Sequence, residues 1–175
     1  NYPCSDDPVN GCYDTFDNNG AKVDTTGVEA VASMDFGNGF SGTASWTHTE
    51  AEVDGTNQQL QDIPLDTAKI LVDWAPDNLP FGAGVNATWV GELADNAPSG
   101  LGRQDIGDYV LVDANARWYL DAGRNHRIGL RVENLFDEEY FSAAGAGRVD
   151  ITDVPYYAPS LGRGRSFHIN YTFDF

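Results

Sequence analysis

Seven stretches of this chain alternate apolar and polar residues over roughly ten positions each, and this period of two constrains the fold more than any other feature. The alternation runs through residues 28–35, 40–47, 68–74, 85–93, 110–118, 128–133 and 166–175. Successive side chains of a strand point to opposite faces, so each stretch predicts a strand with one apolar and one polar face. The sequence therefore predicts an all-β chain.

The connections between these stretches alternate in length. Short turns near residues 38, 78 and 123 take turns with long polar loops over residues 51–65, 95–107 and 136–162. An up-and-down transmembrane barrel has short periplasmic turns at one rim and long loops at the outer rim. The fold class predicted is thus an antiparallel up-and-down transmembrane β-barrel segment.

Charged residues divide the two predicted faces. The apolar faces carry none, whereas the polar faces carry Glu29, Asp35, Lys69, Asp73, Glu92, Asp113, Arg117, Arg127, Arg131, Glu133 and Asp174. A face with that many charges must meet water, because burying an unpaired charge is costly. The apolar face is then either the core of a soluble acidic β-sandwich or a surface in contact with lipid.

Tryptophan favours lipid. All four tryptophans fall on the apolar face, and three of them, Trp46, Trp74 and Trp118, lie near strand ends. Aromatic residues form girdles at both membrane interfaces, so these three are predicted to form one.

The formal net charge of −17 argues against a nucleic-acid partner, which would require a basic surface.

Seven strands do not close a bacterial barrel, whose strands are even in number. The chain is therefore predicted to be part of a larger barrel. An even number of strands within the chain would instead indicate a small free-standing barrel with a structural or adhesive role.

The only cysteines, Cys4 and Cys12, stand among Pro, Asn, Asp and Gly and are predicted to close a small disulfide loop.

Several motifs resemble those of TonB-dependent outer-membrane receptors. The segment RVENLFDEEY at 131–140 is similar to the family's NLF(D/N)xxY, and YYAPSLGRGRSFHINYTFDF at 156–175 resembles its closing stretch. More weakly, TTGVEA at 25–30 and LQDIPLDTAKILVDW at 60–74 resemble earlier strands of the family.

The resemblance implies a plugged barrel of about 22 strands, of which residues 1–175 are the C-terminal portion, with the plug domain and earlier strands outside this chain. It also implies a location in the outer membrane of a Gram-negative bacterium, energy from TonB with ExbB and ExbD, and contact with outer-membrane lipid. The ligand implied first is a ferric siderophore, with heme, cobalamin and oligosaccharides as alternatives.

The same resemblance assigns roles to the last strand. Phe167, Ile169, Tyr171, Phe173 and Phe175 match the family's terminal strand, which faces lipid and is recognised by the barrel assembly machinery. Further candidates are predicted to face the lumen: Asp113, Arg117, Arg127, Arg131 and Glu133. The sequence holds no nucleophile motif and no metal-ligand spacing, so neither catalysis, a cofactor nor a metal site is expected.

Overall fold

The computed structural model describes residues 22–54, 58–60, 62–96, 103–143, 146–149, 154–157 and 159–175. Seven long strands form one antiparallel sheet in the order β1-β2-β3-β4-β7-β8-β13. Their bounds are Val23–Gly37 (β1), Phe40–Val53 (β2), Asp66–Trp74 (β3), Phe81–Val90 (β4), Tyr109–Tyr119 (β7), His126–Glu133 (β8) and Ser166–Phe173 (β13). The prediction of an all-β, antiparallel chain is confirmed.

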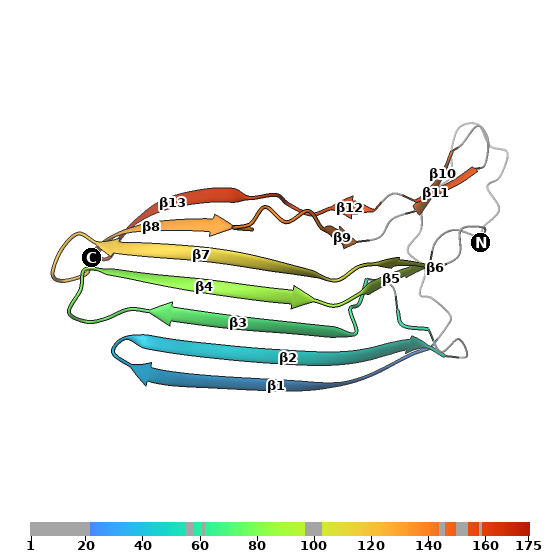
Figure 1. Ribbon diagram of the computed structural model, residues 1–175, viewed down its shortest axis with the longest axis horizontal. Helices are drawn as coiled ribbons and strands as arrows, with labels where there is room; N and C mark the ends of the chain where they lie inside the picture. The colour runs from blue at the N-terminus through green and yellow to red at the C-terminus, as the bar shows by residue number, and fades with distance from the viewer. Residues whose placement is uncertain are drawn as a thin grey trace.

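The seven strands form an up-and-down meander with two different ends (Figure 1). Short turns at 38–39, 75–80 and 120–125 join strand pairs at one end, and the long connections lie at the other. The tightest turn requires glycine at position 39, where φ is +82° and a Cβ atom would lie 2.5 Å from the backbone nitrogen of Pro76. We call these ends the short-turn end and the long-loop end.

The long connections carry short hairpins that the alternation did not predict. The β4–β7 connection contains β5 (Leu93–Asn96) paired with β6 (Arg103–Ile106). The β8–β13 connection contains β9 (Phe141–Ala143) paired with β12 (Ser160–Leu161), and β10 (Ala146–Val149) paired with β11 (Val154–Tyr157).

The predicted strand over residues 85–93 is wrong at its C-terminal end. Strand β4 stops at Val90, and the backbone N–H of Gly91 donates to the carbonyl oxygen of Asp66 at 2.9 Å. Leu93 belongs to β5, where it is buried opposite Ile106, and Glu92 lies in the connection between the two strands. Hydrophobicity alone does not distinguish a strand that continues from one that turns into a new hairpin.

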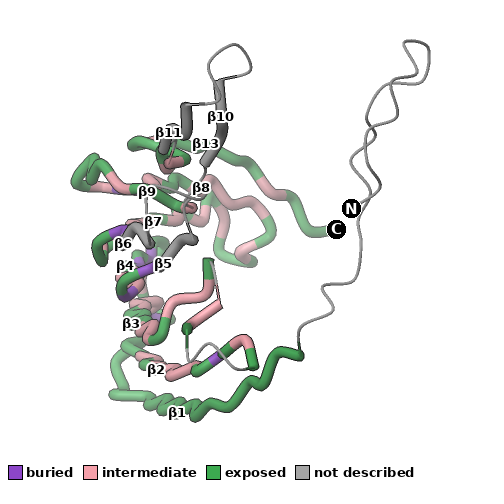
Figure 2. Tube along the Cα trace, turned by 90° about the vertical axis from the view of Figure 1, so that its right-hand side faces the viewer, coloured by how far each residue is buried: buried purple, intermediate pink, exposed green. Residues whose placement is uncertain are grey.

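The sheet is a single curved layer. Figure 2 shows it bending into an arc from β1 to β13. Among the described residues the buried hydrophobic core consists of Ala51, Leu93 and Ile106, and the large apolar side chains of the sheet are mostly exposed. A sandwich needs an inner face covered by a second sheet, and no second sheet covers either face within the described part of the chain, so the structure does not support the sandwich alternative. Along the described residues, no helix is long and apolar enough to cross a membrane.

Candidate functional site

Strand register assigns each residue of the sheet to one of two faces, because directly opposed residues point the same way. One row that crosses all seven strands is polar or glycine: Asp35, Ser41, Asp73, Gly84, Asn115, Arg131 and His168. The adjacent row is apolar or glycine: Met34, Gly42, Val72, Val85, Ala114, Val132 and Phe167. We call the surfaces that contain these rows the polar face and the apolar face.

An ion pair spans three strands of the polar face. Arg117 on β7 donates from Nη1 to Oδ1 of Asp73 on β3 at 2.8 Å and from Nη2 to Oδ2 at 2.5 Å, a two-pronged contact across β4. Both side chains are partly shielded from solvent, with 19% of Arg117 and 31% of Asp73 exposed. A two-pronged guanidinium–carboxylate contact is among the strongest polar contacts in proteins and fixes geometry as well as charge.

Two glycines of β4 make room for this ion pair. A Cβ atom at Gly82 would lie 2.7 Å from the carbonyl oxygen of Trp74 and 2.9 Å from Nε of Arg117. At Gly84 a Cβ atom would lie 2.8 Å from Nδ2 of Asn115. Both glycines are buried beneath the neighbouring side chains. The polar face therefore has two glycines on β4, which we call the glycine floor, and side chains from β3 and β7 make contact above them.

A second polar group lies toward the long-loop end of the same face. Arg131 Nη2 lies 3.3 Å from Oδ2 of Asp113 and 3.2 Å from Oε1 of Glu133, and Glu133 also accepts from the hydroxyl of Ser166 at 3.2 Å. The Arg131 side chain is 55% exposed, so each of these pairs is weak.

Of the five residues predicted to face the lumen, the structure brings together Asp113, Arg131 and Glu133. Arg117 pairs instead with Asp73, which the prediction had placed only as one charge on the polar face. Arg127 lies at the short-turn end of β8, opposite Tyr119 of β7 and Thr172 of β13.

A buried asparagine shapes the corner after β8. Asn134, only 4% exposed, has a left-handed φ of +50°. Its side chain accepts from the N–H of Glu138 at 2.8 Å and donates to the carbonyl oxygens of Glu138 and Arg163 at 2.9 and 3.2 Å. This corner joins the start of the long connection to its end and lies within the NLFDEEY segment, which is the one signal in the sequence that marks it.

Aromatic side chains bound the apolar face at both ends. Trp46 and Trp89 lie in one row at the long-loop end, where their indole N–H groups donate to Asp66 and Asp108 at 3.1 and 2.9 Å. At the short-turn end lie Phe40, Trp74, Phe81, Trp118 and Tyr171. The girdle prediction omitted Trp89.

The spacing of the two aromatic bands matches a membrane. From Val110, in the row of Trp46 and Trp89, to Trp118, strand β7 rises about 27 Å. A strand tilt of about 40° reduces this rise to about 21 Å of depth, close to the roughly 25 Å apolar band of membrane barrels. The paired rows between the bands carry no charged residue on the apolar face.

The last strand presents its aromatic residues on this same face. Ile169 is 76% exposed and Phe167 74%. Nearer the short-turn end, the hydroxyl of Tyr171 lies 2.6 Å from Nδ1 of His126, whose ring stacks on Phe173 at 4.6 Å. Phe175 follows the strand and is fully exposed.

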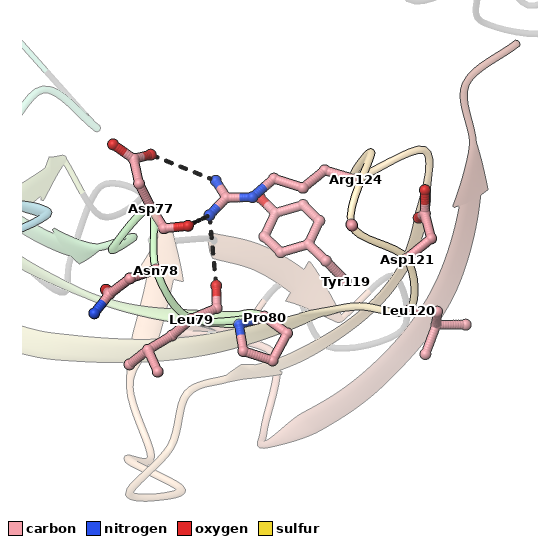
Figure 3. A pocket seen from close by; sticks show the side chains of 9 residues that line it. Asp77, Asn78, Leu79, Pro80, Tyr119, Leu120, Asp121 and Arg124 are labelled. Carbon is pink, nitrogen blue, oxygen red and sulfur yellow. Dashed lines mark hydrogen bonds and ion pairs between the residues drawn. The ribbon is translucent and has the colours of Figure 1, made fainter.

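Two short turns are joined to each other (Figure 3). Nη2 of Arg124 donates to the carbonyl oxygens of Pro76, Asp77 and Leu79 at 2.9, 3.1 and 3.4 Å, and its guanidinium lies 4.8 Å from the centre of the Tyr119 ring. The two turns border a shallow cavity of about 390 Å³.

The β7–β8 turn is closed by Asp121. Its carboxylate accepts from the N–H groups of His126 and Asn125 at 2.8 and 3.3 Å. The backbone hydrogen bond from His126 is the main reason that the pKa of Asp121 is lowered.

The predicted disulfide of Cys4 and Cys12 lies outside the described residues.

A family model described as "TonB dependent receptor-like, beta-barrel" matches residues 2–135. The heme transporter BhuA of Brucella ovis is 28% identical over 116 residues, a match that covers 63% of this chain and 16% of that protein. The same protein of Brucella suis matches equally well. The chain therefore spans only a small part of the curated relatives.

Solved structures share the fold. The pyoverdine outer membrane receptor FpvA from Pseudomonas aeruginosa, bound to pyoverdine, superposes with a TM-score of 0.70 at 23% identity over 89% of this chain and 22% of that chain. The closed form of the ferric-catecholate import receptor Fiu from E. coli gives 0.69 at 18% identity over 95% of this chain and 22% of that chain. At these identities the likeness defines the fold, a partial receptor barrel.

Proposed function

The chain belongs to the TonB-dependent receptor family, and on this basis we propose that it forms the C-terminal wall of an outer-membrane receptor that imports an iron-carrying chelate. In this proposal residues 1–175 are the last third of a plugged barrel, and the plug and earlier strands lie elsewhere in the protein. The receptor resides in the outer membrane of a Gram-negative bacterium and draws energy from TonB with ExbB and ExbD. No catalytic role is proposed.

One observation carries the proposal: the single-layer sheet has two unlike faces. The polar face is charged and hydrogen-bonded, whereas the apolar face is exposed and has no charged residue between its two aromatic bands. In a membrane barrel the first face lines the lumen and the second contacts lipid. The candidates Asp113, Arg117, Arg127, Arg131 and Glu133 then line the lumen, and Trp46, Trp74, Trp89 and Trp118 form the girdles.

The C-terminal strand has two roles in this proposal. Phe167, Ile169, Tyr171 and Phe173 contact lipid in the finished barrel, and together with Phe175 they are the segment that the barrel assembly machinery binds. Their exposure on the edge strand supports both roles, because β13 has a sheet neighbour, β8, on one side only among the described residues.

A ferric siderophore is the ligand we propose first, because the similar solved structures include receptors whose titles name pyoverdine and ferric catecholate. Heme is the second candidate, because the curated relatives are named heme transporters. Cobalamin and oligosaccharides have no such support here.

The test is uptake by cells that lack the complete gene encoding this chain. Under iron limitation, the parent strain and the deletion strain receive radioactive iron either as a siderophore chelate or as heme. We expect the deletion to abolish uptake of one source and leave the other unchanged, and the complete gene to restore it. Unchanged uptake of both sources would contradict the proposal of an iron receptor.

A further inference from the structure

The apolar face is not evenly filled near the short-turn end. On the apolar face of β2, residues Gly42 and Ala44 are small. The residues beside them on the same face are large: Met34 and Phe36 on β1, and Ile70 and Val72 on β3. These residues enclose a furrow of about 340 Å³ with an almost entirely apolar surface. The β-bulge between Asp35 and Gly37 accompanies the turn of Phe36 over Gly42, where a Cβ atom would lie 3.0 Å from the Phe36 ring.

The furrow has the width of one hydrocarbon chain. Neighbouring strands lie about 4.8 Å apart, so the walls on β1 and β3 stand about 10 Å apart between backbones. Side chains on both walls narrow this space further. An α-helix, with a diameter of about 10 Å, does not enter it, whereas an acyl chain does.

The depth of the furrow also points to a membrane component. It lies between the two aromatic bands, and Val72 is about 7 Å along β3 from Trp74 of the short-turn band. Four of its wall side chains remain between 43% and 62% exposed, so they gain contacts only from an external apolar partner: Met34, Phe36, Ile70 and Val72.

We propose that this furrow binds one acyl chain of a phospholipid whose head group lies at the short-turn end. The inference rests on the proposed function, because it requires the apolar face to contact the membrane. The bound chain contacts the protein on three sides and is held longer than lipid on the flat part of the same face. Ala87, Val112 and Ala116 belong to that flat part.

The experiment uses the complete receptor in vesicles of phosphatidylethanolamine, a few of whose molecules carry a photoreactive diazirine in one acyl chain. After irradiation, mass spectrometry measures labelling of the peptide that contains Met34 and of peptides from β7 and β13. The variant Ala44→Phe fills the furrow, Ala32→Phe narrows it from β1, and Ala116→Phe is the matched control on the flat part. Labelling of each peptide is compared between variants rather than between peptides, so differences in reactivity among the strands do not enter the comparison.

We expect each furrow variant to lower labelling of the Met34 peptide about fivefold, equivalent to about 1 kcal/mol of binding, and Ala116→Phe to leave it unchanged. Equal labelling in all variants, or crosslinks between receptor copies in place of lipid at Met34, would overturn the acyl-chain site while leaving the receptor proposal intact. Labelling of no strand at all would overturn the membrane location and both proposals with it.

Discussion

The polar face and the apolar face share one backbone, yet they follow opposite rules. On the polar face, charged residues of different strands form ion pairs, as Arg117 on β7 does with Asp73 on β3 across β4. On the apolar face, aliphatic and aromatic side chains are exposed and no charge lies between the aromatic bands. Both faces belong to the same hydrogen-bonded strands, so the β-propensity of a residue cannot explain the difference between them. The medium that each face contacts decides which residue types it carries.

The largest effect should come from moving a charge between the faces. Ala87→Arg puts a charge at the middle of the apolar face and should lower the free energy of unfolding by about 2–4 kcal/mol, the cost of arginine at the bilayer midplane. The neighbouring Asn86→Arg points to the polar face and should cost far less. Urea unfolding of the complete receptor in lipid vesicles, followed by tryptophan fluorescence, measures both. Equal losses would mean that the apolar face does not contact lipid.

A smaller effect should come from the glycine floor. Gly82→Val forces a side chain against the Trp74 carbonyl and the Arg117 side chain and should lower the free energy of unfolding by about 1–3 kcal/mol, as overpacking does. Ala83→Val is the matched control, because its side chain is exposed on the apolar face. The same unfolding measurement applies. A loss at Ala83 as large as at Gly82 would show that β4 is crowded on both faces.

A third test separates the two polar groups. A double-mutant cycle with Asp73→Asn and Arg117→Met should give a coupling energy of about 1 kcal/mol, as expected for a partly shielded charged hydrogen bond. The cycle with Glu133→Gln and Arg131→Met should give less than about 0.5 kcal/mol, because Arg131 is exposed. A larger coupling energy for Glu133 and Arg131 than for Asp73 and Arg117 would show that the stronger ion pair lies at the long-loop end.

The smallest effect concerns the β7–β8 turn, which belongs to neither face. The pKa of Asp121 is lowered in the folded protein, so its ionised form stabilises the turn fully above the unfolded-state value of 3.8. This contribution is lost as the pH falls through the lower folded-state pKa. Amide hydrogen exchange of His126 should therefore differ between the parent protein and Asp121→Asn above pH 3.8 and converge in more acidic solution. A difference that persists unchanged in strong acid would contradict the role of the charge.

Two features of the sheet were not predicted because they depend on where strands end and on their register. The prediction extends the fourth strand to Leu93, which puts Trp89 in mid-strand and outside the three tryptophans of the predicted girdle. The structure ends β4 at Val90, so Trp89 lies at the strand end beside Trp46. Similarly, Asp73 and Arg117 are 44 residues apart, and only the register of β3, β4 and β7 brings them together.

The sequence by itself determined the number of long strands, their two faces, the division of the ends into short turns and long loops, and the family. It did so because the period of two and the turn residues are local properties of the chain. Tertiary structure alone decided the pairing of Arg117 with Asp73, the glycine floor beneath it, the corner of Asn134 and the furrow on β2. These features depend on which residues of distant strands lie opposite one another, and that is decided by the register of all the strands between them.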